Sequence, residues 1–190
     1  MKKTIITAII LMLISVLIFS GSAEKHKAGK FKKEGGKSIM KVTSSAFENE
    51  KRIPEIYTCK GRDISPGISW EGVSETAKSL VLICDDPDAP AGTWVHWVLY
   101  NIPAGLKGLP ENASDEFYED NGILSGRNSW GKTGYGGPCP PSGVHRYYFK
   151  LYAIDKKLDF KDTTPAKEDI LEAIKAHIVD EAGIMGTFGK

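Results

Sequence analysis

Two groups of residues in this chain could take part in ligand chemistry, and they lie far apart in the sequence. The first follows an apolar run and holds Asp86, Asp88 and His96. The second follows a loop rich in glycine and proline and holds His145 and Tyr147. Each group stands where a strand-like run meets a loop, which is where a rigid scaffold usually presents a binding site.

These residue types suit a pocket for an anion. Histidine and tyrosine side chains can donate hydrogen bonds, and backbone N–H groups of a loop can point at the same ligand. A carboxylate would be an unusual direct partner for an anion. An aspartate makes sense instead as the group that orients a histidine and favours its charged, donating form.

Taken singly, the same residues have ordinary structural explanations. The segment 86–88 could be a simple Asp-Pro-Asp turn, with its proline bond cis or trans. His96 lies between tryptophans on a strand-like run, where a neutral, buried imidazole is common, and His145 is equally ambiguous. Only their combination indicates a pocket. His177 is assigned no role, because the pattern places it on a helix without an acid partner.

A divalent metal site is the alternative chemistry, since histidine and aspartate are good metal ligands. It would make the chain a metal-assisted hydrolase. The sequence contains no His-Glu-x-x-His motif, and it contains no Gly-x-Ser-x-Gly motif of a serine hydrolase. We therefore expect a binding protein without a cofactor, and not an enzyme.

Three strand-like runs must position these side chains. Residues 78–84 form an apolar run typical of a central strand buried on both faces. In residues 94–100, a period of two places Trp94, His96, Val98 and Tyr100 on one face. In residues 144–154 it places His145 and Tyr147 on one face and Arg146 on the other.

The remaining patterns are weaker. Residues 53–58 suggest an edge strand or an extended entry, residues 63–70 a turn and then a short strand, and residues 105–143 a long structured loop. A helix is predicted to open at Thr164-Pro165 and to end at Gly183. Its apolar stripe would be Ile170, Ile174 and Ile178. Many strands and one late helix predict a mainly β fold, a β-sandwich with α additions.

The first 23 residues have the pattern of a secretory signal peptide. Lys2 and Lys3 precede an apolar run over 5–19, and the small residues 21–23 suit cleavage. A retained membrane anchor is the alternative, although the run is short for a span of about 20 residues. We expect a periplasmic or secreted protein.

Charge divides the rest of the chain into two parts. The whole chain carries +1, residues 1–23 contribute +2 and the lysine-rich residues 24–37 contribute +4, which leaves −5 for residues 38–190. We expect residues 24–37 to be a flexible basic linker and residues 38–190 to be one domain. An acidic body argues against nucleic acid as a partner.

Three cysteines follow the signal segment, so they cannot all pair. Cys84 lies in the apolar run and suits a core position, whereas Cys59 and Cys139 lie in loop-like, glycine-flanked sequence and are the more plausible disulfide pair. The chain contains no Cys-x-x-Cys spacing, which gives a zinc knuckle little support.

Several separated motifs, in order, resemble the phosphatidylethanolamine-binding protein family, and in particular its bacterial and archaeal branch, often described as Raf-kinase-inhibitor-like. The resemblance covers roughly residues 42–190. It rests on Asp86-Pro87-Asp88-Ala89-Pro90, His96-Trp97, Gly137-Pro138-Cys139-Pro140-Pro141 and His145-Arg146-Tyr147, with Tyr57-Thr58-Cys59-Lys60-Gly61, Asp63-Ile64-Ser65-Pro66 and Gly186-Thr187-Phe188-Gly189 pointing to the bacterial branch.

The resemblance implies a β-sandwich of antiparallel strands with Greek-key connections, a few peripheral helices and a small surface pocket for anions. Asp86 would orient the histidines, Tyr147 would add a hydroxyl, and Arg146 would be structural. The implied pocket residues are Asp86, Asp88, His96, Cys139, Pro140, His145 and Tyr147.

The implied ligand is a phosphate-like or carboxylate anion, including a phospholipid head group. The implied role is binding, with a regulatory purpose. A secreted inhibitor of a protease or kinase, acting through a protein surface, is the second hypothesis. A Raf partner is implausible for a secreted protein of this branch.

Overall fold

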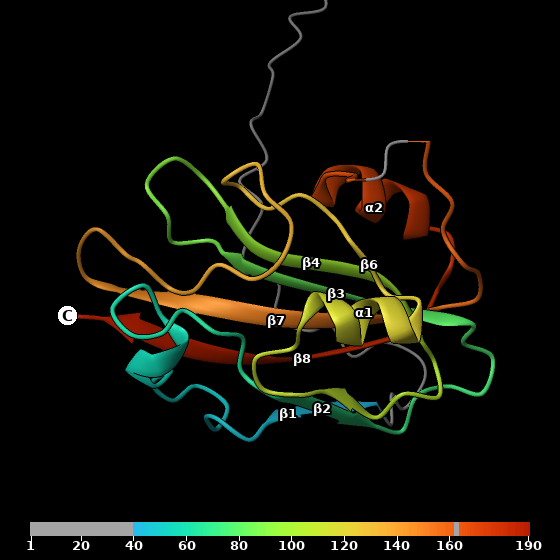
Figure 1. The fold of residues 1–190 in the computed structure, drawn as a ribbon, viewed down its shortest axis with the longest axis horizontal. Helices are drawn as coiled ribbons and strands as arrows, with labels where there is room; N and C mark the ends of the chain where they lie inside the picture. The colour runs from blue at the N-terminus through green and yellow to red at the C-terminus, as the bar shows by residue number, and fades with distance from the viewer. Residues whose placement is uncertain (1–39, 162–163) are drawn as a thin grey trace, which may run out of the picture.

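The computed structural model describes residues 40–161 and 164–190 (Figure 1). The predicted signal segment and basic linker lie outside the described residues. Within the described part of the chain, no helix is long and apolar enough to span a membrane.

Two antiparallel sheets form the framework. The five-stranded sheet has the order β6-β4-β3-β7-β8 and the three-stranded sheet the order β1-β2-β5. The strands are β1 Lys41–Ser44, β2 Ile68–Glu71, β3 Ser79–Asp86, β4 Trp94–Pro103, β5 Gly108–Leu109, β6 Leu124–Ser125, β7 Val144–Ile154 and β8 Ile178–Gly189. The helices are α1 Asp115–Asn121, α2 Lys167–Ile174 and a 3-10 turn, η1, at Glu55–Tyr57.

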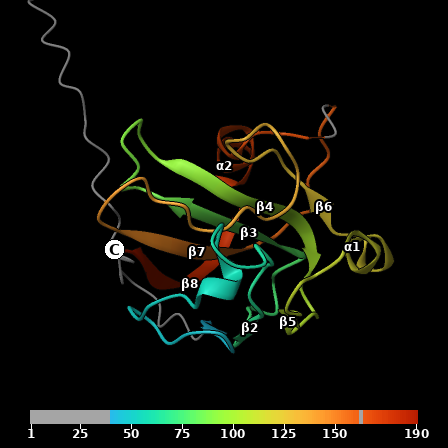
Figure 2. The ribbon, with the colours of Figure 1, turned by 60° about the vertical axis from the view of Figure 1, so that its left-hand side comes forward.

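The layers explain the burial of β3. One apolar cluster fills the space between the two sheets, with Leu82 of β3 and Trp70 of β2 among its members. A second cluster lies on the other face of the large sheet, where Val81 and Ile83 pack with Ile170 of α2. Figures 1 and 2 show the small sheet and α2 on opposite sides of the large sheet. This arrangement confirms the predicted mainly β sandwich.

The three main strands agree with the sequence patterns. All eight residues of β3 are buried, and β3 lies at the centre of its sheet. In β7, buried and partly exposed residues alternate, and the buried set includes His145, Tyr147 and Phe149. Because β3 pairs with both β4 and β7, it brings the two groups of chemistry-bearing residues together.

The predicted late helix is wrong in its second half. The helix α2 ends at Ile174, and Ile178 begins β8, in which Gly183 pairs with Lys150 of β7. Ile170 and Ile174 are buried as the stripe predicts, whereas Ile178 is exposed. His177 lies between helix and strand, and its Nδ1 is 2.8 Å from Oδ1 of Asp155.

Two other assignments are corrected. Residues 53–58 are not an edge strand, because they contain the 3-10 turn η1, which Pro54 precedes in extended backbone. The long loop region 105–143 contains β5, α1 and β6. Ser114 caps α1 by accepting a hydrogen bond from the N–H of Phe117, a local signal that could have identified this helix.

Candidate functional site

A cavity of about 410 Å³ opens where β3 ends and β4 and β7 begin. Antiparallel pairing brings these three ends to the same edge of the sheet, and the loops after β3 and before β7 add the remaining walls. The lining residues are Asp86, Ala89, Pro90, Ala91, Trp94, His96, Trp130, Cys139, Pro140, Pro141 and His145. Five of the seven predicted pocket residues are among them.

Asp86 and His145 form the polar base of the cavity. Nδ1 of His145 lies 2.7 Å from Oδ2 of Asp86, and both residues are buried. The other carboxylate oxygen of Asp86 accepts the backbone N–H of Asp88 at 2.8 Å, which fixes the carboxylate. Because a carboxylate only accepts, Nδ1 of His145 carries the proton. Its Nε2 makes no hydrogen bond to the described residues and is not among the fully buried unpartnered atoms.

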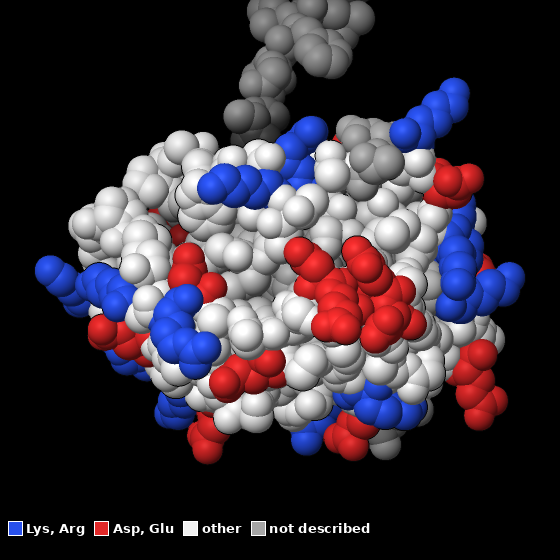
Figure 3. Space-filling model, in the orientation of Figure 1, with Lys and Arg blue, Asp and Glu red and all other residues white. Residues whose placement is uncertain are grey.

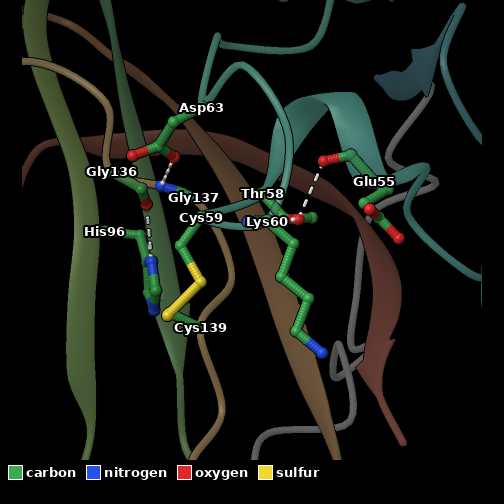
Figure 4. The surroundings of a disulfide bond; sticks show 9 residues. All are labelled: Glu55, Thr58, Cys59, Lys60, Asp63, His96, Gly136, Gly137 and Cys139. Carbon is green, nitrogen blue, oxygen red and sulfur yellow. Dashed lines mark hydrogen bonds between the residues drawn. A yellow bond between two sulfur atoms is a disulfide. The ribbon is translucent and has the colours of Figure 1, made fainter.

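His96 is held by a different group from the one predicted. Its Nδ1 lies 2.6 Å from the carbonyl oxygen of Gly136, and Figure 4 shows this bond next to the disulfide. Asp86 therefore orients His145 but not His96. Burial lowers the pKa of His96, against the opposing effects of the Gly136 carbonyl and of nearby carboxylates, so its imidazole is neutral over a wider range of pH.

A β-bulge turns His96 toward the cavity. Cys84 of β3 pairs with Trp97, but the next residue, Asp85, pairs with Val95, so His96 is an extra residue in β4. The predicted single face of β4 is therefore interrupted. Val98 packs on the side of α2, whereas His96 packs edge-to-face on Tyr147, at 5.2 Å between ring centroids.

Tyr147 lies behind the cavity wall and does not line it. The residue is fully buried, and its hydroxyl has no hydrogen-bond partner among the described residues. Burial, followed by the carboxylate of Asp86, raises the pKa of Tyr147 well above its usual range. In this structure its ring packs on the ring of His96, and Tyr147 is not among the residues that line the cavity.

Asp88 also lies outside the lining. It accepts three hydrogen bonds from Arg146: from the backbone N–H at 3.0 Å, from Nε at 2.8 Å and from Nη2 at 2.6 Å. Asp86 and Asp88 thus bind successive residues of β7, whose side chains face opposite sides of the sheet. The hydrogen bonds from Arg146 hold the pKa of Asp88 below its usual range. Arg146 is not among the residues that line the cavity, which agrees with the opposite face that the strand period predicts for it.

A disulfide between Cys59 and Cys139 fixes the proline-rich wall. The Cα atoms are 5.5 Å apart, and the N–H of Cys59 donates to the carbonyl of Pro138 at 3.2 Å. Figure 4 shows the bond joining the segment after η1 to the loop that carries Gly136 and Gly137. Cys139 also lines a second cavity of about 320 Å³. Cys84 is free and buried.

Trp130 is a wall residue that the sequence patterns missed. It is 44% exposed, and its ring packs edge-to-face on His96 at 5.1 Å and on Trp94 at 5.4 Å. A Cβ on Gly136 would come within 2.6 Å of this ring, so only glycine lets the indole lie there. A tryptophan beside glycines in a polar loop was the available signal.

The charges around the cavity are unusual for an anion site. Its lining contains no lysine and no arginine, so a protonated His145 is the cation that the lining can supply. Figure 3 shows an acidic patch elsewhere, over α1, where Asp115, Glu116, Glu119 and Asp120 gather. Within the described part of the chain, no group of three histidine, cysteine or acidic residues is arranged to hold a metal ion.

Comparisons with known proteins agree with the fold and with the family resemblance of the sequence motifs. The profile of the family described as "Phosphatidylethanolamine-binding protein" matches residues 43–189. A UPF0098 protein of Methanothermobacter thermautotrophicus is 51% identical over 149 residues, which are 78% of this chain and 98% of the relative. A UPF0098 protein of Aquifex aeolicus is 44% identical over 155 residues, 80% of this chain and 90% of the relative.

Two solved structures are similar. One, described as a putative phosphatidylethanolamine-binding protein homologue of Chlamydia trachomatis, has a TM-score of 0.74 and 41% identity over 80% of this chain and 99% of its own. The other is E. coli YbcL, described as a new member of the mammalian phosphatidylethanolamine-binding protein family. It has a TM-score of 0.73 and 30% sequence identity, and the match covers 80% of this chain and 98% of the YbcL chain.

Proposed function

Because the chain belongs to the phosphatidylethanolamine-binding protein family, we propose that it is a secreted or periplasmic binding protein with a regulatory role. Its cavity at Asp86 and His145 takes an anionic phosphate or carboxylate group, free or on a larger molecule such as a phospholipid. The N-terminal sequence and the disulfide between Cys59 and Cys139 support the location, because disulfides persist in oxidising compartments.

The observation that carries the proposal is the hydrogen bond between Asp86 and His145. It holds the imidazole with Nδ1 toward the carboxylate and leaves Nε2 for the cavity. When His145 is protonated, Nε2 becomes a donor, and the buried carboxylate balances the charge.

The lining favours binding over catalysis. No serine lines the cavity, and the cysteine that lines it, Cys139, is held in the disulfide. A histidine that is to activate a nucleophile needs a hydroxyl or thiol within hydrogen-bond reach. We therefore propose that the cavity retains its ligand and does not convert it.

Calorimetric titration with phosphate and phosphoethanolamine tests the proposal. We expect both to bind the wild-type protein and neither to bind His145→Ala. His177→Ala is the matched control, since His177 also bonds an aspartate, Asp155, but lies outside the cavity. Equal binding by the wild type and His145→Ala would remove the site from this cavity. Absence of binding to the wild type would turn the search toward protein partners.

A further inference from the structure

The two imidazoles of the cavity present opposite hydrogen-bonding groups. Nδ1 of His96 faces a carbonyl oxygen, that of Gly136, so Nδ1 must carry the hydrogen. In the neutral ring, Nε2 is then an acceptor. Burial lowers the pKa of His96 and so favours the neutral ring, against the opposing effects of the Gly136 carbonyl and of the carboxylates of Asp86, Asp85 and Asp63. The structure therefore gives the cavity an acceptor on His96.

His145 supplies the complementary donor. Its Nδ1 donates to Asp86, and on protonation its Nε2–H donates into the same cavity. A carboxylate, which only accepts, would satisfy His145 and leave Nε2 of His96 without a donor. The same holds for a phosphate diester, which has no P–OH group. A phosphate that keeps one acidic hydroxyl satisfies both rings.

We propose that the cavity selects singly protonated phosphate monoesters over phosphate diesters. The P–O–H group donates to Nε2 of His96, and a charged oxygen of the same phosphate accepts from Nε2–H of His145. This inference rests on the proposed function, and it narrows the ligand class of that site. A single negative charge also suits a lining in which His145 is the one cation and Asp86 is already its counter-ion.

The walls have room for the organic part of such an ester. A volume of about 410 Å³ lies in the range of pockets for organic ligands, and Trp94, Trp130 and Pro140 line it. Trp130 is presented rigidly, because Oδ1 of Asn128 accepts the N–H of Trp130 at 3.0 Å and that of Lys132 at 3.1 Å. A rigid, half-exposed indole can bury an apolar ester group at little entropic cost.

Phenyl phosphate and methyl phenyl phosphate provide the matched test. At about pH 5.5, below the second phosphate pKa of about 6, both carry one negative charge and only the former has a P–OH group. We expect phenyl phosphate to bind the full chain about tenfold more tightly, since the diester leaves the His96 acceptor unpaired. Isothermal calorimetry measures both affinities under the same conditions.

His96→Asn tests whether His96 is the residue that accepts the hydrogen bond from the P–OH group. Asparagine can still donate from Nδ2 to Gly136 but has no group in place of Nε2, so we expect the preference to fall to about threefold or less. His177→Asn, outside the cavity, is the control and should keep the preference. A folded His96→Asn protein with the full preference would overturn the assignment. If that variant does not fold, the ratio of the affinities of the wild-type protein for the two ligands still tests the monoester preference.

The outcomes separate this inference from the proposed function. Equal affinity for the monoester and the diester overturns the inference and leaves an anion cavity. No binding of either ester or of inorganic phosphate overturns the proposed function. Where the monoester preference holds, sedimentation with vesicles containing phosphatidic acid, a lipid monoester, tests whether the bound monoester belongs to a lipid or to a soluble molecule. If the protein sediments with those vesicles, the ligand is assigned as a lipid ester; if the protein stays in solution, the ligand is assigned as a soluble ester.

Discussion

The carboxylate of Asp86 accepts a hydrogen bond from Nδ1 of His145 over 2.7 Å. This hydrogen bond connects the last residue of β3 with the start of β7. The neighbouring Asp85 makes ion pairs on the opposite face, with Lys150 at 3.0 Å and Lys167 of α2 at 2.6 Å. Two successive carboxylates at the end of one strand therefore serve different purposes, one holding α2 on the sheet and one building the cavity.

Replacing Asp86 by asparagine should lower phosphate affinity on the order of tenfold at about pH 6. The amide can still accept from Nδ1, but it carries no negative charge to balance an imidazolium, and the imidazolium is the form of His145 that donates from both ring nitrogens. Calorimetry measures the affinity, and circular dichroism checks the fold. Unchanged affinity in a folded variant would show that the carboxylate charge is not used.

Removing the disulfide should destabilise the domain. Cys59 and Cys139 are 80 residues apart, and a cross-link over such a loop contributes about 4.5 kcal/mol by restricting the unfolded chain. We expect Cys59→Ser/Cys139→Ser to unfold at a correspondingly lower urea concentration and to bind phosphate more weakly, because Cys139 is part of the wall.

A dithiol reductant supplies the control for the disulfide prediction. It should shift the unfolding of the wild-type protein toward that of the double serine variant and leave the variant itself unchanged, because the remaining Cys84 is buried and free. A wild-type protein with the same unfolding curve in oxidant and reductant would contradict the prediction.

The main strands could be predicted because their own residues encode them. β3 begins with an apolar run, and β7 alternates between buried and more exposed residues as far as Ala153. The identity of β8 is not encoded locally. The spacing of Ile170, Ile174 and Ile178 continues a helical stripe, and the strand exists because residues 178–189 pair with β7. Gly186, a poor strand former, is required because a Cβ would come within 2.5 Å of Ile53.

The candidate site, like the fold, could be predicted from the sequence only in part. The positions of Asp86 and His145 follow from the strands that carry them. The partner of His96 does not, because a bulge in β4 and the backbone of a distant loop decide which group its Nδ1 meets. The family resemblance implied Asp88 as a pocket residue, but Asp88 lies beyond the end of β3, where its carboxylate binds Arg146 outside the cavity lining. Trp130 was missed because no periodic pattern surrounds it.

Asp88→Asn should cost about 1 kcal/mol of unfolding free energy at about pH 7, the upper range for a partly exposed ion pair. The pKa of Asp88 is lowered in the folded protein, so the contribution is present above the usual aspartate pKa of about 3.9 and is lost as the pH falls through the lowered value. Urea titrations of both proteins at several pH values measure the difference.

Glu71→Gln is the control for the Asp88 prediction. Its partner Lys41 is 3.8 Å away, and both side chains are largely exposed, so the substitution should change stability by less than Asp88→Asn. A difference between wild type and Asp88→Asn that persists unchanged at acid pH would show that charge is not the source of the effect.

The last prediction concerns the pH dependence of stability that His96 causes. Burial lowers its folded pKa below the usual value of about 6.5, so below that pH the unfolded chain binds a proton that the folded protein does not. Folding stability should therefore fall as the pH decreases from about 6.5 toward the folded pKa. His96→Asn keeps the hydrogen bond to Gly136 and has no titrating group, so its unfolding free energy should depend less on pH in this window. His177→Asn, which removes a partly exposed histidine, separates this effect from a general loss of imidazole. Parallel curves for wild type and His96→Asn would mean that His96 is protonated equally in the folded and unfolded states, and the acceptor assigned to its Nε2 would lose its physical basis.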